Sequence, residues 1–145
     1  MVQNKLPYKE FLHIFSKVPR CCVELIVETK EGIVFTKRKI KPYKGKWHLP
    51  GGSVLLNESL KQAVKRVAKE ELNLNVELVR RLGVIEYFYG KKEKKHSISI
   101  VFLVKINSGK IKLDEQASEF KISRKSPPNL IKNHKEFIKS YLNKT

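Results

Sequence analysis

An amphipathic helix that stands between two groups of β-rich runs constrains the fold more than any other feature of the sequence. Before it come the runs 21–29 and 32–40, which a Lys-Glu-Gly turn joins as a hairpin, and a short run at 47–49. After it come the runs 76–90, 97–106 and 109–113. Asn57 and Ser59 are candidate N-caps of the helix. Its apolar residues recur at the three- and four-residue steps of a helix with one buried face: Leu60, Ala63, Val64, Val67 and Ala68.

Two further helices are expected at the ends of the chain. The first follows Pro7, with apolar residues at near-helical spacing between Phe11 and Val18. The second follows Pro128, and its predicted apolar face is Leu130, His134, Phe137, Ile138 and Tyr141. The order helix, strands, helix, strands, helix predicts an α/β fold with a mixed sheet covered on both sides. A length of 145 residues fits one domain, 1–145.

Composition narrows the class of protein. No apolar run is long enough to cross a bilayer, and the first fifteen residues lack the core of a signal peptide, so a cytoplasmic protein without a membrane partner is expected. Cys21 and Cys22 are adjacent, so we expect reduced thiols in a strand, one pointing inward and one outward. The formal charge of +17 fits a solvated surface that steers anionic ligands better than a nucleic-acid partner, because the lysines are spread along the whole chain.

Charged residues on the central helix suggest a metal site. Arg66 and Glu70 are four residues apart, Glu58 precedes Arg66 by about two turns, and Glu71 follows Glu70. Magnesium prefers carboxylate oxygens and often bridges to substrate phosphates. A solvated helix face is the alternative for these residues. The glycine pair directly upstream, which lets backbone atoms approach a ligand, favours the metal site.

The stretch from Gly52 to Leu74, "GSVLLNESLKQAVKRVAKEELNL", resembles the Nudix box, G-x5-E-x7-R-E-U-x-E-E-x-G-U, in which U is aliphatic. Glu58, Arg66, Glu70 and Glu71 match it. The resemblance implies the α/β/α Nudix sandwich and Mg²⁺-dependent hydrolysis of a nucleoside diphosphate linked to another group, with Mn²⁺ as a substitute. Val67 replaces a glutamate of the box, which argues for fewer metal ions. Asn73 replaces its last glycine, a mild change because Asn tolerates a left-handed backbone conformation.

From Phe11 to about Ile122 the chain is similar to the GDP-mannose mannosyl hydrolase branch of this family, which also lacks the glutamate at the Val67 position. That resemblance implies a metal held by Gly51, Glu71 and Gln116, and we add Glu70 to this set. It also matches Glu24 and Arg38 to substrate-binding positions. Lys41 and Tyr43 are further candidates for binding a diphosphate and a base, with strand-end charge and loop packing as their alternatives.

The branch has a histidine base directly after the glutamine, where this chain has Ala117. Glu115 and Glu119 flank Gln116 and are the expected replacements, with Glu70 and Arg66 as the catalytic residues on the helix. The metal-binding residues match the family pattern better than the base on the sugar side does, which favours attack of water at phosphorus over attack at the sugar carbon.

We therefore expect a Mg²⁺-dependent hydrolase of a nucleotide-sugar such as GDP-mannose. The alternative is a degenerate domain that binds nucleotide or RNA without turnover. The sequence leaves open whether the chain forms a homodimer.

Overall fold

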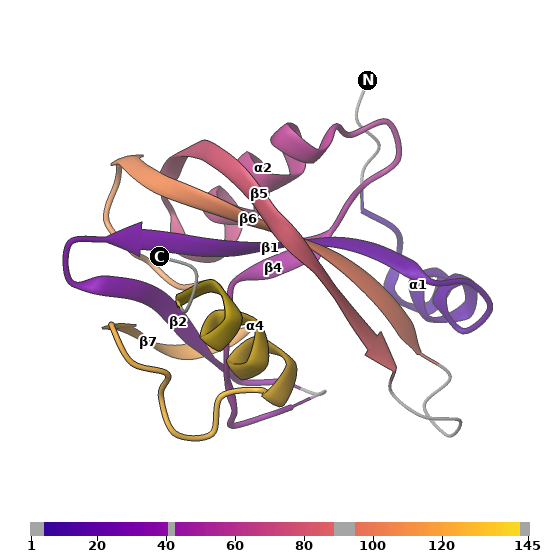
Figure 1. The fold of residues 1–145 in the computed structure, drawn as a ribbon. Helices are drawn as coiled ribbons and strands as arrows, with labels where there is room; N and C mark the ends of the chain where they lie inside the picture. Colours follow the sequence, from indigo (N-terminus) through magenta and orange to yellow (C-terminus); the bar gives the residue numbers. More distant parts are fainter. Residues whose placement is uncertain (1–4, 41–42, 89–94, 143–145) are drawn as a thin grey trace.

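The computed structural model describes residues 5–40, 43–88 and 95–142. Figure 1 shows their arrangement, with the central sheet crossing the molecule. Of the helices in these ranges, none combines the length and the apolarity that a membrane span needs. The elements, in chain order, are α1 (Tyr8–Phe15), β1 (Arg20–Thr29), β2 (Gly32–Arg38), β3 (Trp47–His48), β4 (Gly51–Ser53), α2 (Leu60–Leu72), β5 (Asn75–Phe88), β6 (His96–Ser108), β7 (Ala117–Ser123) and α4 (Lys132–Leu142).

The sheet is mixed, as predicted. Its main path runs β3-β2-β1-β6-β5, with β4 paired to β1 and β7 paired to β2. β1 and β6 are parallel, whereas the other pairs of named strands are antiparallel. The short strand β4 lies beside β1, so Gly51 is in register with Glu24 and Gly52 with Val23. This pairing brings the glycine pair to the middle of the fold.

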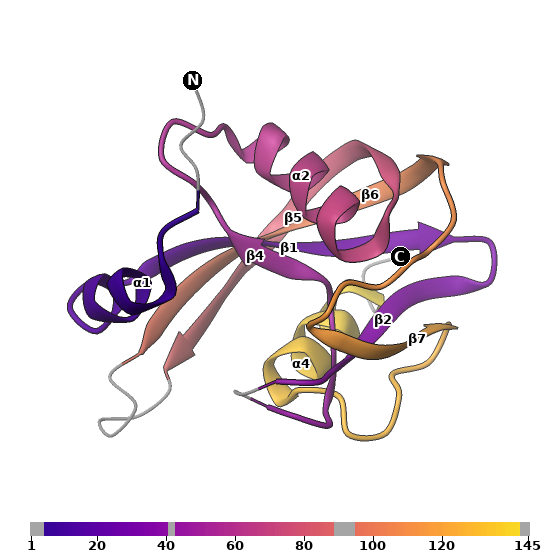
Figure 2. The ribbon, with the colours of Figure 1, turned by 180° about the vertical axis from the view of Figure 1, so that it is seen from behind.

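Helices cover the two faces of the sheet, which confirms the predicted α/β/α layering (Figures 1 and 2). Alternate residues of β1 belong to different cores. Val23, Leu25 and Val27 pack with the apolar face of α2, whereas Ile26 packs with Ile138 of α4. Helix α1 has no buried residues and is attached at the start of β1, where the Arg20 guanidinium lies 5.5 Å from the Phe11 ring centre.

Local sequence explains both ends of α2. Ser59 is the N-cap and forms a capping box with Gln62, in which each side chain accepts a hydrogen bond from the other's backbone amide. Asn57, the other candidate, has a positive φ of 66° before the helix begins. At the C-terminal end Asn73 adopts the left-handed conformation, with φ 60°, that the glycine of the family pattern would adopt easily.

The prediction of a strand at 109–113 was wrong. Ile111 and Leu113 pack against the core on the α2 face without joining the sheet, and the Lys112 amide donates to the Leu72 carbonyl at 2.9 Å. The alternating apolar residues of this segment therefore cover the end of α2. The last strand is β7, which the sequence analysis missed. The C-terminal helix begins at Lys132, so Leu130 precedes it.

Candidate active site

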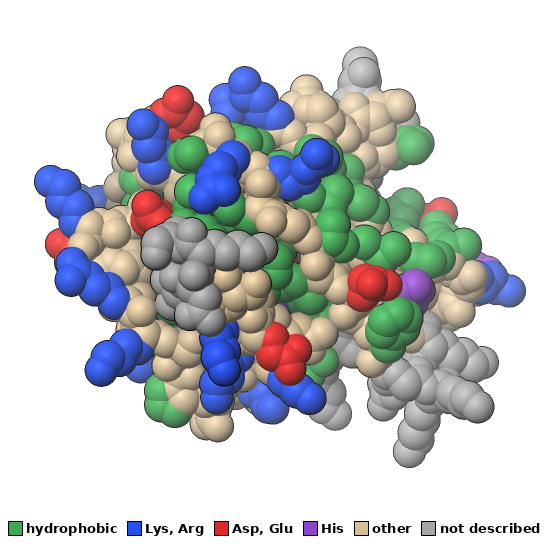
Figure 3. Space-filling model, in the orientation of Figure 1, with side chains coloured by type: hydrophobic (Ala, Val, Ile, Leu, Met, Phe, Trp, Pro, Cys, Tyr) green, Lys and Arg blue, Asp and Glu red, His purple; other side chains and the backbone are tan. Residues whose placement is uncertain are grey.

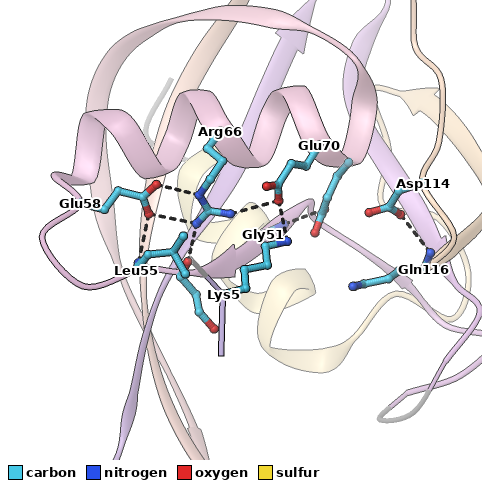
Figure 4. A network of polar contacts seen from close by, with 10 residues as sticks. Lys5, Gly51, Leu55, Glu58, Arg66, Glu70, Asp114 and Gln116 are labelled. Atoms are coloured by element: carbon cyan, nitrogen blue, oxygen red, sulfur yellow. Dashed lines mark hydrogen bonds and ion pairs between the residues drawn. The ribbon is translucent and has the colours of Figure 1, made fainter. Parts of the chain in front are cut away.

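Arg66 organises the first part of the site. Its Nε donates to Glu58 Oε2 at 2.7 Å, and its Nη2 donates to Glu58 Oε1 at 3.0 Å and to the Ser53 carbonyl at 2.6 Å. The Leu55 amide also donates to Glu58 Oε1, at 3.1 Å. Figure 4 shows this network beneath α2. It joins the helix to β4, which contains the glycine pair, and to the loop after it, so Arg66 and Glu58 hold this backbone in place.

The Glu70 carboxylate lies at the edge of this network. Its Oε2 accepts from Arg66 Nη1 at 3.1 Å and from Lys5 Nζ at 2.8 Å (Figure 4). Two cationic partners hold it toward the N-terminal segment, and its side chain is about two fifths exposed. In this arrangement Glu70 is engaged with side-chain cations.

Glu71 is partly buried beside the glycine pair. The Gly51 amide donates to its Oε2 at 3.2 Å. Burial and the nearby Asp114 carboxylate raise the pKa of Glu71 to about 8, and Arg38 and the Gly51 amide only partly offset this rise. A buried carboxylate with such surroundings gains most from a cation placed next to it.

The loop before β7 supplies two more polar side chains. Asp114 Oδ1 accepts from the Gln116 amide at 3.0 Å (Figure 4). Both residues line the same small cavity as Glu71 and Arg38. Ala117 also lines this cavity. Burial, followed by the charge of Glu115, raises the pKa of Asp114, although the Gln116 amide opposes this rise. Asp114 was missed by the sequence analysis, and the signal that could have found it is its place two residues before the matched glutamine.

Neither of the two predicted bases, Glu115 and Glu119, lines the small cavity beside Glu71, and their catalytic role stays a prediction. Glu119 Oε1 forms an exposed ion pair with Lys37 Nζ at 3.3 Å. Arg38 and Tyr43 both line the larger cleft described below. Lys41 falls outside the described residues.

The side chains present fit a hard cation with mixed oxygen donors. Within the described ranges no three acidic, histidine or cysteine side chains converge on one point. Glu71, the amide oxygen of Gln116 and the backbone of Gly51 would form the donor set, which a hard cation such as Mg²⁺ would complete with waters and phosphate oxygens. The raised pKa of the Glu71 carboxyl, caused by desolvation and by Asp114, is the observation that a bound cation would explain.

Val67 occupies the position at which the box has a glutamate. Its side chain is 2% exposed and packs in the core formed with β1. A Cβ added to Gly52 would lie 3.2 Å from Val67 Cγ2, so this side chain fills the space beneath the glycine pair.

Glu24 is buried on the α4 face of the sheet. Its carboxylate accepts from the Tyr87 hydroxyl at 2.7 and 2.9 Å and lies 3.0 Å from His134 Nε2. His134 had been expected only as part of an apolar helix face. Its polar partners come from β1, β5 and the segment after β3, and spacing along one helix could not indicate them.

A cleft of about 1160 Å³ opens above these groups, which is large enough for a nucleotide-sized ligand. Apolar residues of α1, among them Phe11 and Phe15, line part of it. Glu24, Glu71, Asp114 and Gln116 also line it. The cleft thus combines apolar and oxygen-bearing side chains, the composition expected for a ligand with a base or sugar and a charged group.

Comparison with known proteins agrees with this geometry. The family model described as NUDIX domain matches residues 17–141. The low-salt glycan biosynthesis protein Agl8 of Haloferax volcanii is 33% identical over 124 residues, which cover 82% of this chain and 80% of that protein. An ADP-ribose pyrophosphatase of Methanocaldococcus jannaschii is 34% identical over 136 residues, covering 93% and 77%. The crystal structure of a MutT NUDIX hydrolase from Burkholderia pseudomallei has a TM-score of 0.78 and 25% identity, covering 85% of this chain and 98% of that one.

Proposed function

Because this chain belongs to the Nudix family of hydrolases, we propose that it hydrolyses a nucleoside diphosphate linked to a sugar, such as GDP-mannose, with Mg²⁺ as cofactor. The names of two relatives support a sugar-linked nucleoside diphosphate as the substrate. One is named for glycan biosynthesis and the other as an ADP-ribose pyrophosphatase. Both names are consistent with a diphosphate that carries a sugar.

The observation that carries the proposal is the position of Glu71. Its partly buried carboxylate accepts from the Gly51 amide and lines the cleft together with the nearby Asp114. Glu71, the Gln116 amide oxygen and Gly51 would hold Mg²⁺ there. Glu70 would join this set once its oxygen is released from Lys5. The ion would supply Lewis-acid stabilisation of the negative charge that develops on the diphosphate.

The other residues have binding and orienting roles. Arg38 lies near Glu71 at the same cavity, where its guanidinium would neutralise part of the diphosphate charge. Arg66 keeps Glu58, Glu70 and the Ser53 carbonyl in place. Asp114 faces the cleft at the position where Glu115 and Glu119 were expected, and it would accept a hydrogen bond from the attacking water.

The carboxylates gathered near the diphosphate end favour attack of water at phosphorus. Hydrolysis in ¹⁸O-water followed by mass spectrometry tests this preference. We expect the label in a phosphate-containing product. Label in the free sugar, with unlabelled nucleoside diphosphate, would establish attack at the sugar carbon instead.

A Mg²⁺-dependent activity screen tests the proposal as a whole. It should include nucleotide-sugars, ADP-ribose, dinucleotides and nucleoside triphosphates, with Glu71→Gln as the inactive control. Turnover of nucleoside triphosphates alone would refute the sugar-linked substrate. No turnover of any compound would favour the alternative, a domain that binds nucleotide or RNA.

The charge of +17 is the observation behind that alternative. On the face seen in Figure 3, Lys and Arg side chains are dispersed among apolar and acidic ones instead of forming a stripe. A dispersed distribution suits the steering of small anions better than the tracking of a nucleic-acid backbone.

A further inference from the structure

In the segment Leu49–Gly51, which leads to Gly52, each residue has a backbone group that is hydrogen-bonded. The Leu49 amide donates to His134 Nδ1 at 3.0 Å, and the Leu49 carbonyl accepts from His48 Nδ1 at 2.6 Å. The Pro50 carbonyl accepts from the Leu25 amide at 2.8 Å. The Gly51 amide donates to Glu71. This segment is the part of the backbone that reaches the proposed metal ligands.

These contacts assign opposite tautomers to the two histidines. A ring nitrogen that accepts from a backbone amide has no hydrogen, so His134 carries its hydrogen on Nε2. A ring nitrogen that faces a carbonyl oxygen must donate, so His48 carries its hydrogen on Nδ1 and accepts from the Thr36 hydroxyl at Nε2, 3.0 Å away. Burial, with smaller effects from His134 and Arg38, lowers the pKa of His48 to about 3, which keeps this ring neutral.

Glu24 and Tyr87 fix the tautomer of His134 through contacts with its Nε2 atom. Its Nε2–H points to Glu24 Oε1 at 3.0 Å, and the Tyr87 hydroxyl contacts both that nitrogen and the Glu24 carboxylate. His134 and Tyr87 are both buried. A carboxylate that accepts from the Nε2–H leaves Nδ1 as the acceptor, so Glu24 and Tyr87 orient the ring for the Leu49 amide.

We propose that His134 is a positioning residue of the hydrolase, through which α4 holds Leu49–Gly51 in the geometry that presents Gly51 beside Glu71. The effect of His134 on Mg²⁺ binding rests on the proposed function, whereas its hydrogen bonds to Leu49 and Glu24 do not. His134 lies in α4, far along the chain from the box, and it contacts Leu49 and Glu24 but no proposed ligand of the metal. Its effect on Mg²⁺ therefore passes through the backbone.

Two substitutions separate the two sides of the ring. In His134→Asn the amide oxygen takes the place of Nδ1, so the acceptor for the Leu49 amide is kept and the Glu24 contact is lost. In His134→Gln the longer side chain reaches toward Glu24 and the Leu49 acceptor is lost. Groups that orient a metal ligand typically contribute about 10- to 100-fold to metal affinity. We expect Mn²⁺ affinity within about threefold of wild type for His134→Asn and a loss of at least tenfold for His134→Gln.

Tyr141→Phe is the control for a polar change in the same helix, because its hydroxyl donates to Glu28 Oε2 at 3.0 Å, away from the glycine pair. Titration calorimetry with Mn²⁺ on folded protein, checked by circular dichroism, measures all three variants. Equal Mn²⁺ affinity of His134→Gln and Tyr141→Phe would overturn the positioning role.

A second measurement does not depend on activity or on metal. Long-range ¹H–¹⁵N correlation spectra distinguish the protonated from the unprotonated ring nitrogen of each histidine. We expect the hydrogen on Nε2 of His134 and on Nδ1 of His48. A hydrogen on Nδ1 of His134 would overturn the inference even in an active enzyme. Wild-type protein that shows the expected tautomers yet binds no Mn²⁺ would overturn the proposed function and, with it, the positioning role, but not the hydrogen-bond network.

Discussion

The ion pair between Glu58 and Arg66 provides the sharpest test of how this site is held together. The Glu58 side chain is 2% exposed, and its two oxygens accept two hydrogen bonds from Arg66 and one from the Leu55 amide. In Glu58→Gln one of these oxygens becomes an NH₂ group that faces a donor. Losing a hydrogen bond to a charged group costs roughly 1.5–3 kcal/mol, so we expect a loss of about 2–3 kcal/mol at pH 7.

Urea unfolding followed by circular dichroism measures this loss. With an m-value of about 2–3 kcal/mol/M, the midpoint should fall by roughly 1 M. Glu77→Gln is the matched control, since the Glu77–Lys105 pair at 3.4 Å is mostly exposed. Its removal should cost less than about 1 kcal/mol. Equal midpoints for the two variants would refute the argument.

The pH dependence adds a second condition. Burial favours the neutral form of Glu58, but the hydrogen bonds from Arg66 and from the Leu55 amide outweigh it and lower the pKa of Glu58 below its ordinary 4.5. A carboxyl group with a lowered pKa stabilises the fold above the unfolded-state value, and this contribution is lost as the pH falls through the folded-state value. The difference between wild type and Glu58→Gln should therefore persist at pH 7 and 5 and shrink below about pH 4.5. A difference that grows on acidification would contradict the assignment.

Three further outcomes follow from the same structure. Glu71→Gln should abolish Mn²⁺ binding in calorimetry while the protein stays folded. Because the pKa of Glu71 is raised to about 8, the metal-free wild type should lose stability between about pH 4.5 and 8, and the variant should lack this decline; parallel curves would refute it. Gly51→Ala should lower stability by about 1–3 kcal/mol in urea unfolding, because the new Cβ would lie 2.7 Å from the Val23 carbonyl oxygen, and a neutral effect would contradict this contact. A thiol reagent should label one cysteine per folded chain, the exposed Cys21, since burial raises the pKa of Cys22 to about 11; rapid labelling of both would show that Cys22 is accessible.

The sequence predicted those features that depend on local spacing. The apolar stripe of α2, the hairpin of β1 and β2 and the opposite exposure of Cys21 and Cys22 all follow from the period of a helix or a strand. The resemblance to the Nudix box also marked Glu71, and the resemblance to the mannosyl hydrolase branch marked Gln116; both line one cavity in the structure.

What the sequence could not predict depends on contacts between distant segments. Choosing among Asp114, Glu115 and Glu119 requires the path of the loop into β7, and the pairing of β7 with β2 shifts register between Lys37 and Arg38. Such an irregularity changes which side chains face the cleft. The polar role of His134 likewise depends on partners in three other elements, and its position on an apolar helix face concealed it.

The parallel pairing of β1 with β6 has a consequence for how the protein acquires its structure. Arg20 is in register with Ser97, and Glu28 with Lys105, so the two central strands are far apart in the sequence. During synthesis on the ribosome, β1 can form its hairpin with β2 early, but its other edge stays unpaired until β6 has emerged. Pairings between such distant segments carry a large loop-closure entropy and fold slowly, in milliseconds to seconds. Until β6 emerges, the nascent chain would expose the unpaired edge of β1, which makes this strand a segment on which a chaperone could act.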